Sequence, residues 1–566
     1  MKAIGIDLGT TNSLISVFEE NGPRLIKNPL GKVLTPSAIS IGSDGQIITG
    51  EAARERLITH PEVSVASFKR FMGANRETKL GKKSFRPQEL SSFILRALKA
   101  DAEADLNETI EQAIISVPAY FNDQQRQATI EAGQLAGLEV QRLVNEPTAA
   151  ALAYGLSEKK EGNFLIFDLG GGTFDISILD KYDDIMEIKA TTGDTRLGGD
   201  DFTDAITQIL AKRHDINMDK LTLQEKAQVL SLAEQLKCKL TKEQELPYQL
   251  SLSAKTQSGN ITRSEFELAC ASLLQRLRLP TERAVRDSKI QAKDFDAIVM
   301  VGGATRMPMV RSLVARMFGK LPMINIDPDT TVALGACVQA GLIQRNSALK
   351  DIIMTDVCPY TLGVATVDDS DDPTGKLSIS AIIERNAVIP ISRTITLNTV
   401  QKNQKQLNVE VYQGENLRPE NNIHLGTIEV GVPRNQKGAE TVDITFTYDL
   451  NGALQVEVLV NSTKRKYQEI FGNTANLSKQ ELEKRFEVLQ SIKLHPRDKV
   501  ENQTLIAKAE RVYEDANTEQ REWIKASISD FEREIGNQQL RNPDQVRASF
   551  AEQIDAIEKQ IDRLDH

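Results

Sequence analysis

Short apolar runs alternate with longer amphipathic stretches over residues 1 to about 345. Residues 113–117 and 298–301 each form a compact apolar run stopped by a proline or by two glycines. A run of this length is typical of a buried strand. Residues 91–104 instead repeat apolar side chains at the three-to-four-residue spacing of an amphipathic helix. The alternation predicts an α/β domain.

Two glycine-containing turns interrupt this pattern at similar points. Asp7–Thr11 and Asp168–Asp175 each lie between two apolar strands, and each begins with Asp-Leu-Gly. Glycine lets the backbone approach a ligand closely, and the free N–H groups of such a turn can bind phosphate oxygens. The leading aspartates suggest a nearby cation. One such turn is equally well explained as a plain tight hairpin, but two copies argue against coincidence.

The first 345 residues also contain an internal duplication. The hairpin at 164–179 repeats the one at 3–18, and the strand at 298–301 repeats the one at 113–117. Duplication on this scale predicts two similar lobes. A ligand is then expected between them, where small-molecule sites commonly lie.

The pattern changes beyond residue 345. Residues 346–356 are polar with a short apolar patch, and we interpret them as an interdomain linker; one more strand is the open alternative. Residues 357–475 alternate apolar and polar positions, and Asn451-Gly452 is a hairpin signal, so we expect an antiparallel β domain. Residues 476–566 begin with a capping box at Ser478–Glu481 and are helical. We interpret them as a helical appendage, with a coiled-coil oligomeriser as the alternative.

Composition narrows the function. Of 566 residues, 69 are Lys or Arg and 79 are Asp or Glu, a net charge of −10. This balance does not indicate a nucleic-acid partner. The sequence has no run of 18 apolar residues, hence no expected membrane span. The four cysteines form no CxxC pair and the five histidines have no metal-ligand spacing. We therefore expect neither a zinc site nor a disulfide framework, and a cytoplasmic location.

Six motifs follow one another along the chain: Ile4–Ser13, Val117–Phe121, Asn145–Ala150, Phe167–Asp175, Leu197–Phe202 and Val301–Pro308. Together they resemble the motifs of one family, the seventy-kilodalton heat-shock chaperones of the DnaK type. The resemblance covers essentially the whole chain, and the short length and unusual linker are most similar to the specialised bacterial HscC-type branch.

The resemblance implies an actin-like two-lobe ATPase domain (1–345), a linker (346–356), a β-sandwich that binds peptides (357–475) and an α-helical lid (476–566). It implies ATP or ADP and Mg²⁺ as cofactors, with K⁺ as a candidate further ion. Asp7 and Asp168 would orient water around Mg²⁺, which favours carboxylates and retained water. Lys69, Glu146 and Thr173 would serve hydrolysis with these two aspartates. The phosphates would lie against Gly9, Thr10, Thr11, Asn12, Gly170, Gly171 and Gly172.

The same resemblance assigns three further groups of residues. For two of these groups, spacing alone leaves a simpler alternative open. Glu234, Lys237 and Thr241 could form an ordinary charged face of a helix, and the residues assigned to peptide binding could be plain β-sandwich core. The adenosine side would use Glu234, Lys237, Thr241, Gly303, Ala304, Arg306 and Asp329. The relay between domains would use Pro118, Arg126, Arg142 and Asp356. The peptide site would use Val364, Thr366, Val367, Val400, Leu407 and Val409.

The implied function is an ATP-dependent chaperone that binds extended apolar segments of unfolded client proteins, works with a J-domain co-chaperone and is monomeric. Chain is missing, relative to general members, between Leu197–Phe202 and Glu234, and Thr355 replaces an apolar linker residue. We therefore hypothesise a specialist whose nucleotide exchange does not depend on the usual exchange factor. A sugar-type kinase and an actin-like filament protein use the same ATPase fold. Residues 357–566 argue against both.

Overall fold

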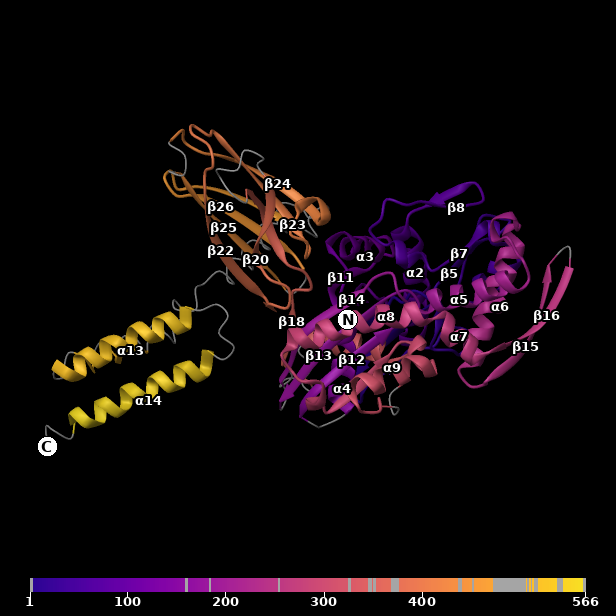
Figure 1. Ribbon diagram of the computed structural model, residues 1–566, viewed down its shortest axis with the longest axis horizontal. Helices are drawn as coiled ribbons and strands as arrows, with labels where there is room; N and C mark the ends of the chain where they lie inside the picture. The colour runs from indigo at the N-terminus through magenta and orange to yellow at the C-terminus, as the bar shows by residue number, and fades with distance from the viewer. Residues whose placement is uncertain are drawn as a thin grey trace. The chain divides into compact units, whose positions relative to one another are not determined.

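The computed structural model (Figure 1) divides by its contacts into two compact units. The first comprises Met1–Ile389, Glu410–Gly426 and Leu450–Ala453, and the second comprises Pro390–Val409, Thr427–Asp449 and Leu454–His566. The structure describes residues 4–157, 161–182, 185–252, 255–323, 327–344, 349, 353–367, 376–435, 440–449, 452–471, 505, 508–509, 512–513, 518–536 and 543–562.

The N-terminal apolar runs form one mixed sheet with the order β11-β10-β1-β2-β3. β1 pairs antiparallel with β2 across the first glycine turn and parallel with β10, and β10 pairs parallel with β11. Its apolar residues are buried because helices cover the sheet. The strands are β1 (Ile4–Asp7), β2 (Asn12–Glu19), β3 (Gly22–Leu25), β4 (Thr35–Pro36), which pairs with β2, β10 (Gln112–Val117) and β11 (Glu139–Asn145).

A second sheet repeats this plan with the order β17-β12-β13-β14-β18-β21. β12 pairs antiparallel with β13 across the second glycine turn, with Asp168 opposite Asp175, and pairs parallel with β17. The internal duplication predicted from the sequence is therefore confirmed in the strand pairing. The strands are β12 (Gly162–Leu169), β13 (Phe174–Tyr182), β14 (Ile185–Asp194), β17 (Ala297–Val301), β18 (Ile353–Val357) and β21 (Val388–Ile389).

Two apolar helices pack together beside the sheets. α4 (Glu146–Ser157) contacts α10 (Thr331–Ile343), and α10 also lies against β1. These contacts are close enough to require glycine. A Cβ on Gly335 would lie 1.7 Å from the carbonyl oxygen of Ala149, and one on Gly5 would lie 2.2 Å from the backbone nitrogen of Cys337. A larger residue at Gly335 would force α10 away from α4, and one at Gly5 would force α10 away from β1.

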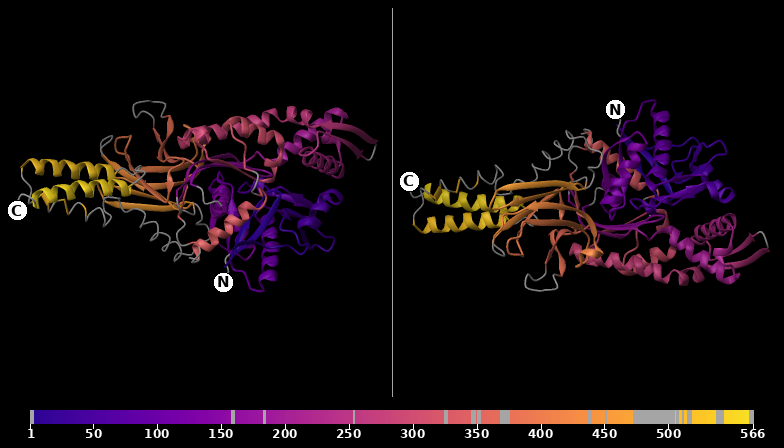
Figure 2. Two further views of the ribbon diagram at one scale, coloured as in Figure 1. Left: turned by 90° about the horizontal axis from the view of Figure 1, so that it is seen from below. Right: turned by 90° about the horizontal axis from the view of Figure 1, so that it is seen from above.

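The remaining elements of the N-terminal half form outer parts on both lobes. In Figure 2, the indigo N-terminal residues and the magenta residues after about 200 lie on opposite sides of this half. The first lobe carries β5 (Ala38–Ile41), β6 (Ile47–Thr49), α1 (Gly50–Thr59), β7 (Ser64–Ala66), η2 (Phe68–Phe71), β8 (Thr78–Leu80), β9 (Lys83–Phe85), α2 (Pro87–Leu106) and α3 (Asp123–Leu135). The second carries α5 (Gly199–Arg213), α6 (Leu223–Leu240), β15 (Glu245–Leu252), β16 (Lys255–Thr262), α7 (Arg263–Ala269), α8 (Ala271–Ser288) and α9 (Pro308–Phe318).

The segment interpreted as a linker is in part a strand. β18 pairs parallel with β14 and antiparallel with β21, so the strand alternative is correct for residues 353–357. Residues 346–348 and 350–352 of the predicted linker lie outside the described residues.

The alternating region forms two four-stranded sheets, and the antiparallel prediction is confirmed in the pairs described. One has the order β20-β19-β23-β24 and the other β22-β25-β26-β27. The Asn451-Gly452 signal falls between β25 and β26, although Asn451 lies outside the described residues. The strands are β19 (Leu362–Val367), β20 (Leu377–Ile383), β22 (Ile391–Asn398), β23 (Gln406–Gln413), β24 (Ile423–Gly431), β25 (Thr441–Tyr448), β26 (Leu454–Val460) and β27 (Arg465–Phe471).

The C-terminal residues contain two long helices, α13 (Thr518–Gly536) and α14 (Pro543–Asp562). They run side by side in Figures 1 and 2. Phe531 stacks on Phe550 with ring centroids 4.2 Å apart. The capping box predicted at Ser478–Glu481 lies outside the described residues.

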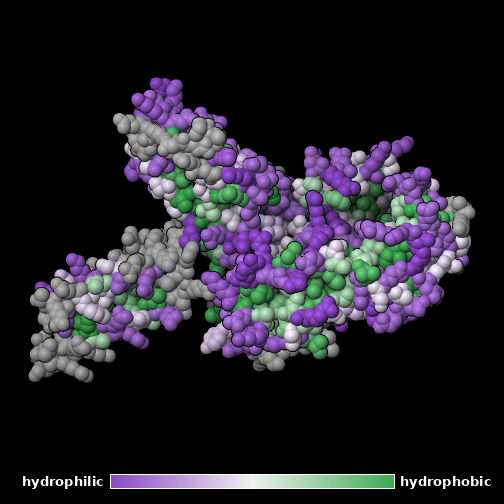
Figure 3. Space-filling model, viewed as in Figure 1, coloured by the Kyte–Doolittle hydropathy of each residue, from purple (hydrophilic) through white to green (hydrophobic). Residues whose placement is uncertain are grey.

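The surface is predominantly polar on the face that Figure 3 shows, with hydrophobic patches between the charged side chains of the N-terminal half. Within the described ranges, no helix is both long and apolar enough to cross a bilayer.

Candidate functional site

The two glycine turns face each other across the two sheets. A Cβ on Gly171 would lie 1.9 Å from Oγ1 of Thr11, and one on Gly172 would lie 2.9 Å from Cγ2 of Thr10. Only glycine permits this approach. Ser37 secures the first turn, because its hydroxyl donates to the carbonyl of Gly9 at 2.8 Å. The structure therefore brings the two predicted phosphate-binding turns together.

Three buried aspartates surround the turns. Asp7 ends β1 and accepts a 2.8 Å hydrogen bond from the Ser116 hydroxyl, while Asp168 and Asp175 lie on either side of the second turn. Burial, reinforced by the charge of Glu146, raises the pKa of Asp7 to about 7 and that of Asp175 to about 8. The same two causes raise the pKa of Asp168 well above its ordinary value. Without a cation, the folded site favours protonated carboxyl groups.

Lys69 supplies a positive charge beside these acids. It lies on the short 3-10 helix η2, with only 3% of its side chain exposed, and its Nζ donates to Oε1 of Glu146 at 2.7 Å. Glu146 begins α4, at the carboxyl end of β11. A lysine this deeply buried is not a solvated surface residue.

The donor set fits a hydrated magnesium ion. The Oδ2 atom of Asp168 is buried and has no hydrogen-bond partner among the described residues. In that part of the chain, no three His, Cys, Asp or Glu side chains converge to hold a metal directly. Carboxylates that accept hydrogen bonds from an ion's retained water shell suit this arrangement.

A second pair of glycines connects the phosphate turn to helix α5. The backbone N–H of Gly199 donates to the carbonyl of Gly170 at 2.9 Å, and that of Asp200 donates to Gly171 at 2.8 Å. A Cβ on Gly198 would lie 2.4 Å from the nitrogen of Gly172. The N-terminus of α5 is thus held against the turn.

Two residues predicted for the adenosine side meet at this junction. The Nζ of Lys237 donates to the carbonyl of Gly199 at 3.0 Å, and pairs with Oε2 of Glu234 at 2.6 Å. Both lie on α6, and Thr241 is the residue that caps its C-terminus. The predicted common helical face therefore points toward the glycine turns.

The other predicted adenosine residues cluster after β17. The guanidinium of Arg306 bridges Asp327 at 2.8 Å and Asp329 at 2.7 Å. A Cβ on Gly303 would lie 2.9 Å from Oδ1 of Asp329, so this loop is tightly packed. Ala304 extends the cluster toward α5, with its Cβ 3.6 Å from the position of a Cβ on Gly199. Both groups of predicted adenosine residues therefore border the same turn.

The predicted relay forms a hydrogen-bonded chain. Arg126, on α3, donates to the carbonyls of Phe121 and Ala119 and to Oδ1 of Asn145 at 2.6 Å. Asn145 in turn donates to Oδ2 of Asp356 at 2.8 Å. Thr148 donates to the same oxygen at 3.1 Å. The chain connects α3 to β18.

The other two predicted relay residues lie near this chain. Pro118 follows β10, and its carbonyl accepts a hydrogen bond from the Phe121 N–H at 3.1 Å. Arg142 lies on β11, the strand that ends at Asn145, and pairs in register with Ile114.

The predicted peptide-site residues differ in burial. Val364 and Val409 are 1% and 3% exposed, so they lie in apolar core positions of their strands. Thr366, Val367, Val400 and Leu407 are half-buried. Half-buried apolar side chains are the better candidates for contact with a bound segment, because a core residue has no free surface.

Sequence reasoning did not assign several residues that the structure brings to the site. They are Ser116, Tyr120, Asn145 and Thr148. Asn145 and Thr148 lie within the Asn145–Ala150 motif, so motif position was an available signal. Their partners are up to 211 residues away, and no local pattern encodes such contacts.

Comparison with known proteins gives one consistent result. The model of the family described as Hsp70 protein matches residues 3–80 and 74–566. The chaperone protein dnaK3 of Thermosynechococcus vestitus is 37% identical, and the match covers 98% of this chain and 87% of that protein. The chaperone protein DnaK 1 of a Synechococcus species is also 37% identical, over 90% of this chain and 72% of that protein. With the facing glycine turns and their buried acids, these matches show that the chain is a member of the Hsp70 family.

Proposed function

We propose that the facing glycine turns hydrolyse ATP, and that the nucleotide state controls the binding and release of extended apolar client segments by residues 357–475. As a member of the Hsp70 family the protein is an ATP-dependent molecular chaperone and an ATPase. The observation that carries the proposed site is the approach of Gly171 and Gly172 to Thr10 and Thr11, with Lys69 buried beside them. Family membership over residues 74–566 also disfavours the kinase and filament alternatives.

Each predicted residue then has a definite task. The backbone N–H groups of Gly9–Asn12 and Gly170–Gly172 bind the phosphates, and Lys69 contributes charge on the γ-phosphate side. Magnesium, when bound, offsets phosphate charge while Asp7 and Asp168 hold its water shell. Glu146 positions Lys69, and Thr173 orients the attacking water. Catalysis of this kind depends on positioning and charge stabilisation, which suits a site without His or Cys nucleophiles.

The base and ribose are proposed to lie beyond the second turn. Glu234, Lys237 and Thr241 supply polar contacts from α6, and Arg306 is held by Asp329 in the facing loop. Gly303 and Ala304 leave room for a planar ring. K⁺ is a candidate second cation for the remaining negative charge of the site.

The C-terminal part is proposed to bind clients in strand-like form. Main-chain hydrogen bonds would supply affinity, and a pocket that includes Leu407 would select an apolar side chain. Val367 and Val400 would close over the segment. In this proposal residues 357–475 form a β-sandwich, residues 476–566 form its lid, and residues 346–356 connect it to the ATPase domain.

The remaining parts of the proposal concern the partner protein, the cellular location, the oligomeric state and the branch of the family. A J-domain co-chaperone is the expected partner, with Arg142 and Asp356 near its site of action. A cytoplasmic location agrees with four free cysteines, three of them buried. We further propose a monomer, of the specialised HscC-type branch.

Replacing Thr173 by alanine tests the hydrolytic site. We expect a loss of single-turnover hydrolysis of about 100-fold, the size typical of removing one transition-state contact. The dissociation constant of ATP should stay within about threefold. Thr207→Ala, on helix α5, is a control for loss of a buried threonine hydroxyl, because that hydroxyl donates to the backbone carbonyl of Thr203 at 3.1 Å and not to a residue of the site. Unchanged turnover in Thr173→Ala would refute the assigned role.

Replacing Leu407 by phenylalanine tests the peptide site. The half-buried side chain can accept a larger ring, whereas Val409→Phe overfills a core position and tests packing as well. Fluorescence anisotropy with a labelled unfolded peptide should show about tenfold weaker binding, with the basal ATPase rate unchanged. Normal peptide affinity would mean that the pocket lies elsewhere.

The chain missing before α6 motivates a separate hypothesis about nucleotide exchange. Release of a labelled nucleotide, followed by stopped flow, should not depend on the exchange factor that serves general family members. Strong acceleration by that factor would overturn the hypothesis.

A further inference from the structure

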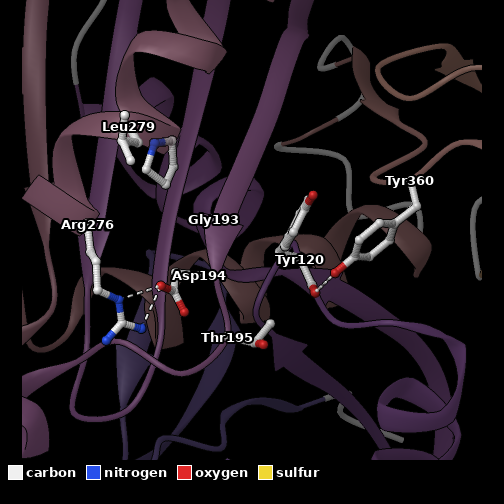
Figure 4. A pocket seen from close by; sticks show the side chains of 8 residues that line it. Tyr120, Gly193, Asp194, Thr195, Arg276, Leu279 and Tyr360 are labelled. Carbon is white, nitrogen blue, oxygen red and sulfur yellow. Dashed lines mark hydrogen bonds and ion pairs between the residues drawn. The ribbon is translucent and has the colours of Figure 1, made fainter. Parts of the chain in front are cut away.

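Tyr360 stacks on Tyr120 (Figure 4). The ring centroids are 4.3 Å apart with an interplanar angle of 35°, and the Tyr360 hydroxyl donates to the carbonyl oxygen of Tyr120 at 2.7 Å. Both residues belong to the first compact unit. Tyr360 follows β18, and its own carbonyl accepts a hydrogen bond from the thiol of Cys358 at 3.1 Å.

Tyr120 is also bonded to the hydrolytic site. Its backbone N–H donates to Oδ1 of Asp175 at 3.0 Å. Asp175 is 1% exposed and lies opposite Asp168 across the second glycine turn. One residue therefore connects Tyr360 with a carboxylate beside the phosphates.

Tyr120 also borders a pocket. With Tyr360 it lines a pocket of about 350 Å³, whose other walls come from the end of β14 and from α8. Asp194 and Arg276 form a 2.7 Å ion pair in this wall, as Figure 4 shows. Arg126 donates to the carbonyls of the two neighbouring residues, Ala119 and Phe121. The hydroxyl of Tyr360 is bonded to the carbonyl of Tyr120 itself, so it constrains the one peptide group of the three that Arg126 does not contact.

We propose that Tyr360 is a positioning residue for ATP hydrolysis. Its hydroxyl fixes the main chain of Tyr120, and the Tyr120 N–H then holds the Asp175 carboxylate in place beside the second glycine turn. The inference rests on the proposed hydrolytic site. It gives a residue downstream of β18 an effect on the chemical step. Tyr360 is not a member of the predicted relay of Pro118, Arg126, Arg142 and Asp356.

The expected direction follows from preorganisation. A carboxylate held in one orientation needs no rearrangement during the reaction, whereas a mobile one does. Loss of the Tyr360 hydroxyl should therefore slow hydrolysis and leave nucleotide binding unchanged, since Tyr360 itself lies outside the glycine turns.

Tyr360→Phe tests this, because it keeps the ring and removes only the hydroxyl. In single-turnover hydrolysis of prebound ATP by the full chain, we expect a rate three- to tenfold lower, about the effect of one hydrogen bond. The dissociation constant of ATP should stay within about twofold. Tyr412→Phe is the matched control, because the Tyr412 hydroxyl bonds to Glu410 and not to the Tyr120 loop. It should hydrolyse ATP at the wild-type rate.

A double-mutant cycle with Asp175→Ala, which removes the acceptor of the Tyr120 N–H, tests the route. In that background Tyr360→Phe should have no further effect on the rate. An equal drop in both backgrounds would overturn the proposal, as would an unchanged rate in Tyr360→Phe alone or a parallel loss of ATP affinity. If the wild-type protein itself fails to hydrolyse ATP, the proposed hydrolytic site fails, and this outcome is distinct from the others.

Discussion

The buried pair of Lys69 and Glu146 serves two purposes at the scale of single residues. It places a cation beside the phosphate turns, and it neutralises a carboxylate that is only 10% exposed. Removing one member of a buried pair costs more than the pair contributes, because the other charge is left without a partner. The contribution of this pair to stability can therefore be measured separately from its contribution to hydrolysis, by replacing one member and then both.

Lys69→Met should lose hydrolysis by at least about 100-fold and lower the free energy of unfolding by roughly 3 kcal/mol, because Glu146 loses its partner. The double variant with Glu146→Gln should regain much of the stability and none of the hydrolysis. Urea unfolding of the nucleotide-free protein and single-turnover assays measure the two effects. Hydrolysis that recovers together with stability would mean that the pair is only structural.

Some residues of the site could be predicted from local sequence pattern, and others could not. The glycine turns and their aspartates could be found from pattern alone, since the chemistry of phosphate binding requires them locally. Lys69 could be named only through the family resemblance, because a lysine between two phenylalanines has no local signature. The partners of Asp356 depend on contacts across more than 200 residues, which periodicity cannot encode.

At the scale of elements, η2 and α5 are joined across the two lobes. Arg70, next to Lys69 on η2, donates through one nitrogen to both carboxylate oxygens of Asp201 at 3.1 and 3.0 Å. The other terminal nitrogen lies 3.7 Å from Asp200, in the first turn of α5. A charge-assisted contact of this kind opposes separation of the two elements.

Arg70→Ala should accelerate release of a labelled ADP by about five- to tenfold, which corresponds to roughly 1 kcal/mol for a partly buried charged contact. Added salt should accelerate release from the wild-type protein more than from the variant. Arg76→Ala is the control, because the Arg76 guanidinium lies 3.7 Å over the Phe71 ring of the same segment. Equal release rates in wild type and Arg70→Ala would show that this contact does not limit exchange.

The sequence predicted which helices and strands exist better than it predicted the residues at which they begin and end. The helix expected at 91–104 begins earlier, as α2 at Pro87, because proline at the first position lacks only an N–H that has no helical partner. For the same reason Pro543 can be the first residue of α14. The start of α3 is fixed by a local contact, because the Asn122 side chain accepts from the N–H of Gln125.

At the scale of the whole molecule, strand β18 determines how the segment after the ATPase domain is held. Thr355 lies opposite Glu187 of β14, and its Oγ1 is buried without a hydrogen-bond partner among the described residues. A hydroxyl in this position therefore disfavours the docking of β18 on β14. An unsatisfied buried hydroxyl costs about 1–3 kcal/mol.

Thr355→Val should therefore stabilise the pairing of β18, because valine has the same shape without the hydroxyl. Limited proteolysis at residues 345–356 should slow by about fivefold or more, as expected for a gain of at least 1 kcal/mol. Thr148→Val makes the opposite change, because that hydroxyl does bond to Asp356. Cleavage should then accelerate. Identical cleavage of both variants would contradict the role assigned to Thr355.

The strand order of the two sheets also constrains when the ATPase domain can fold during synthesis. β1 pairs with β10, about a hundred residues later, and also lies against α10, which ends at Ile343. β12 likewise cannot form its parallel pairing until β17 has been synthesised. The first strand therefore emerges from the ribosome with β2 but long before β10 and α10 exist, and long-range pairing of this kind is slow. A nascent chain of this chaperone would itself display an apolar strand and thus resemble the clients that the finished protein binds.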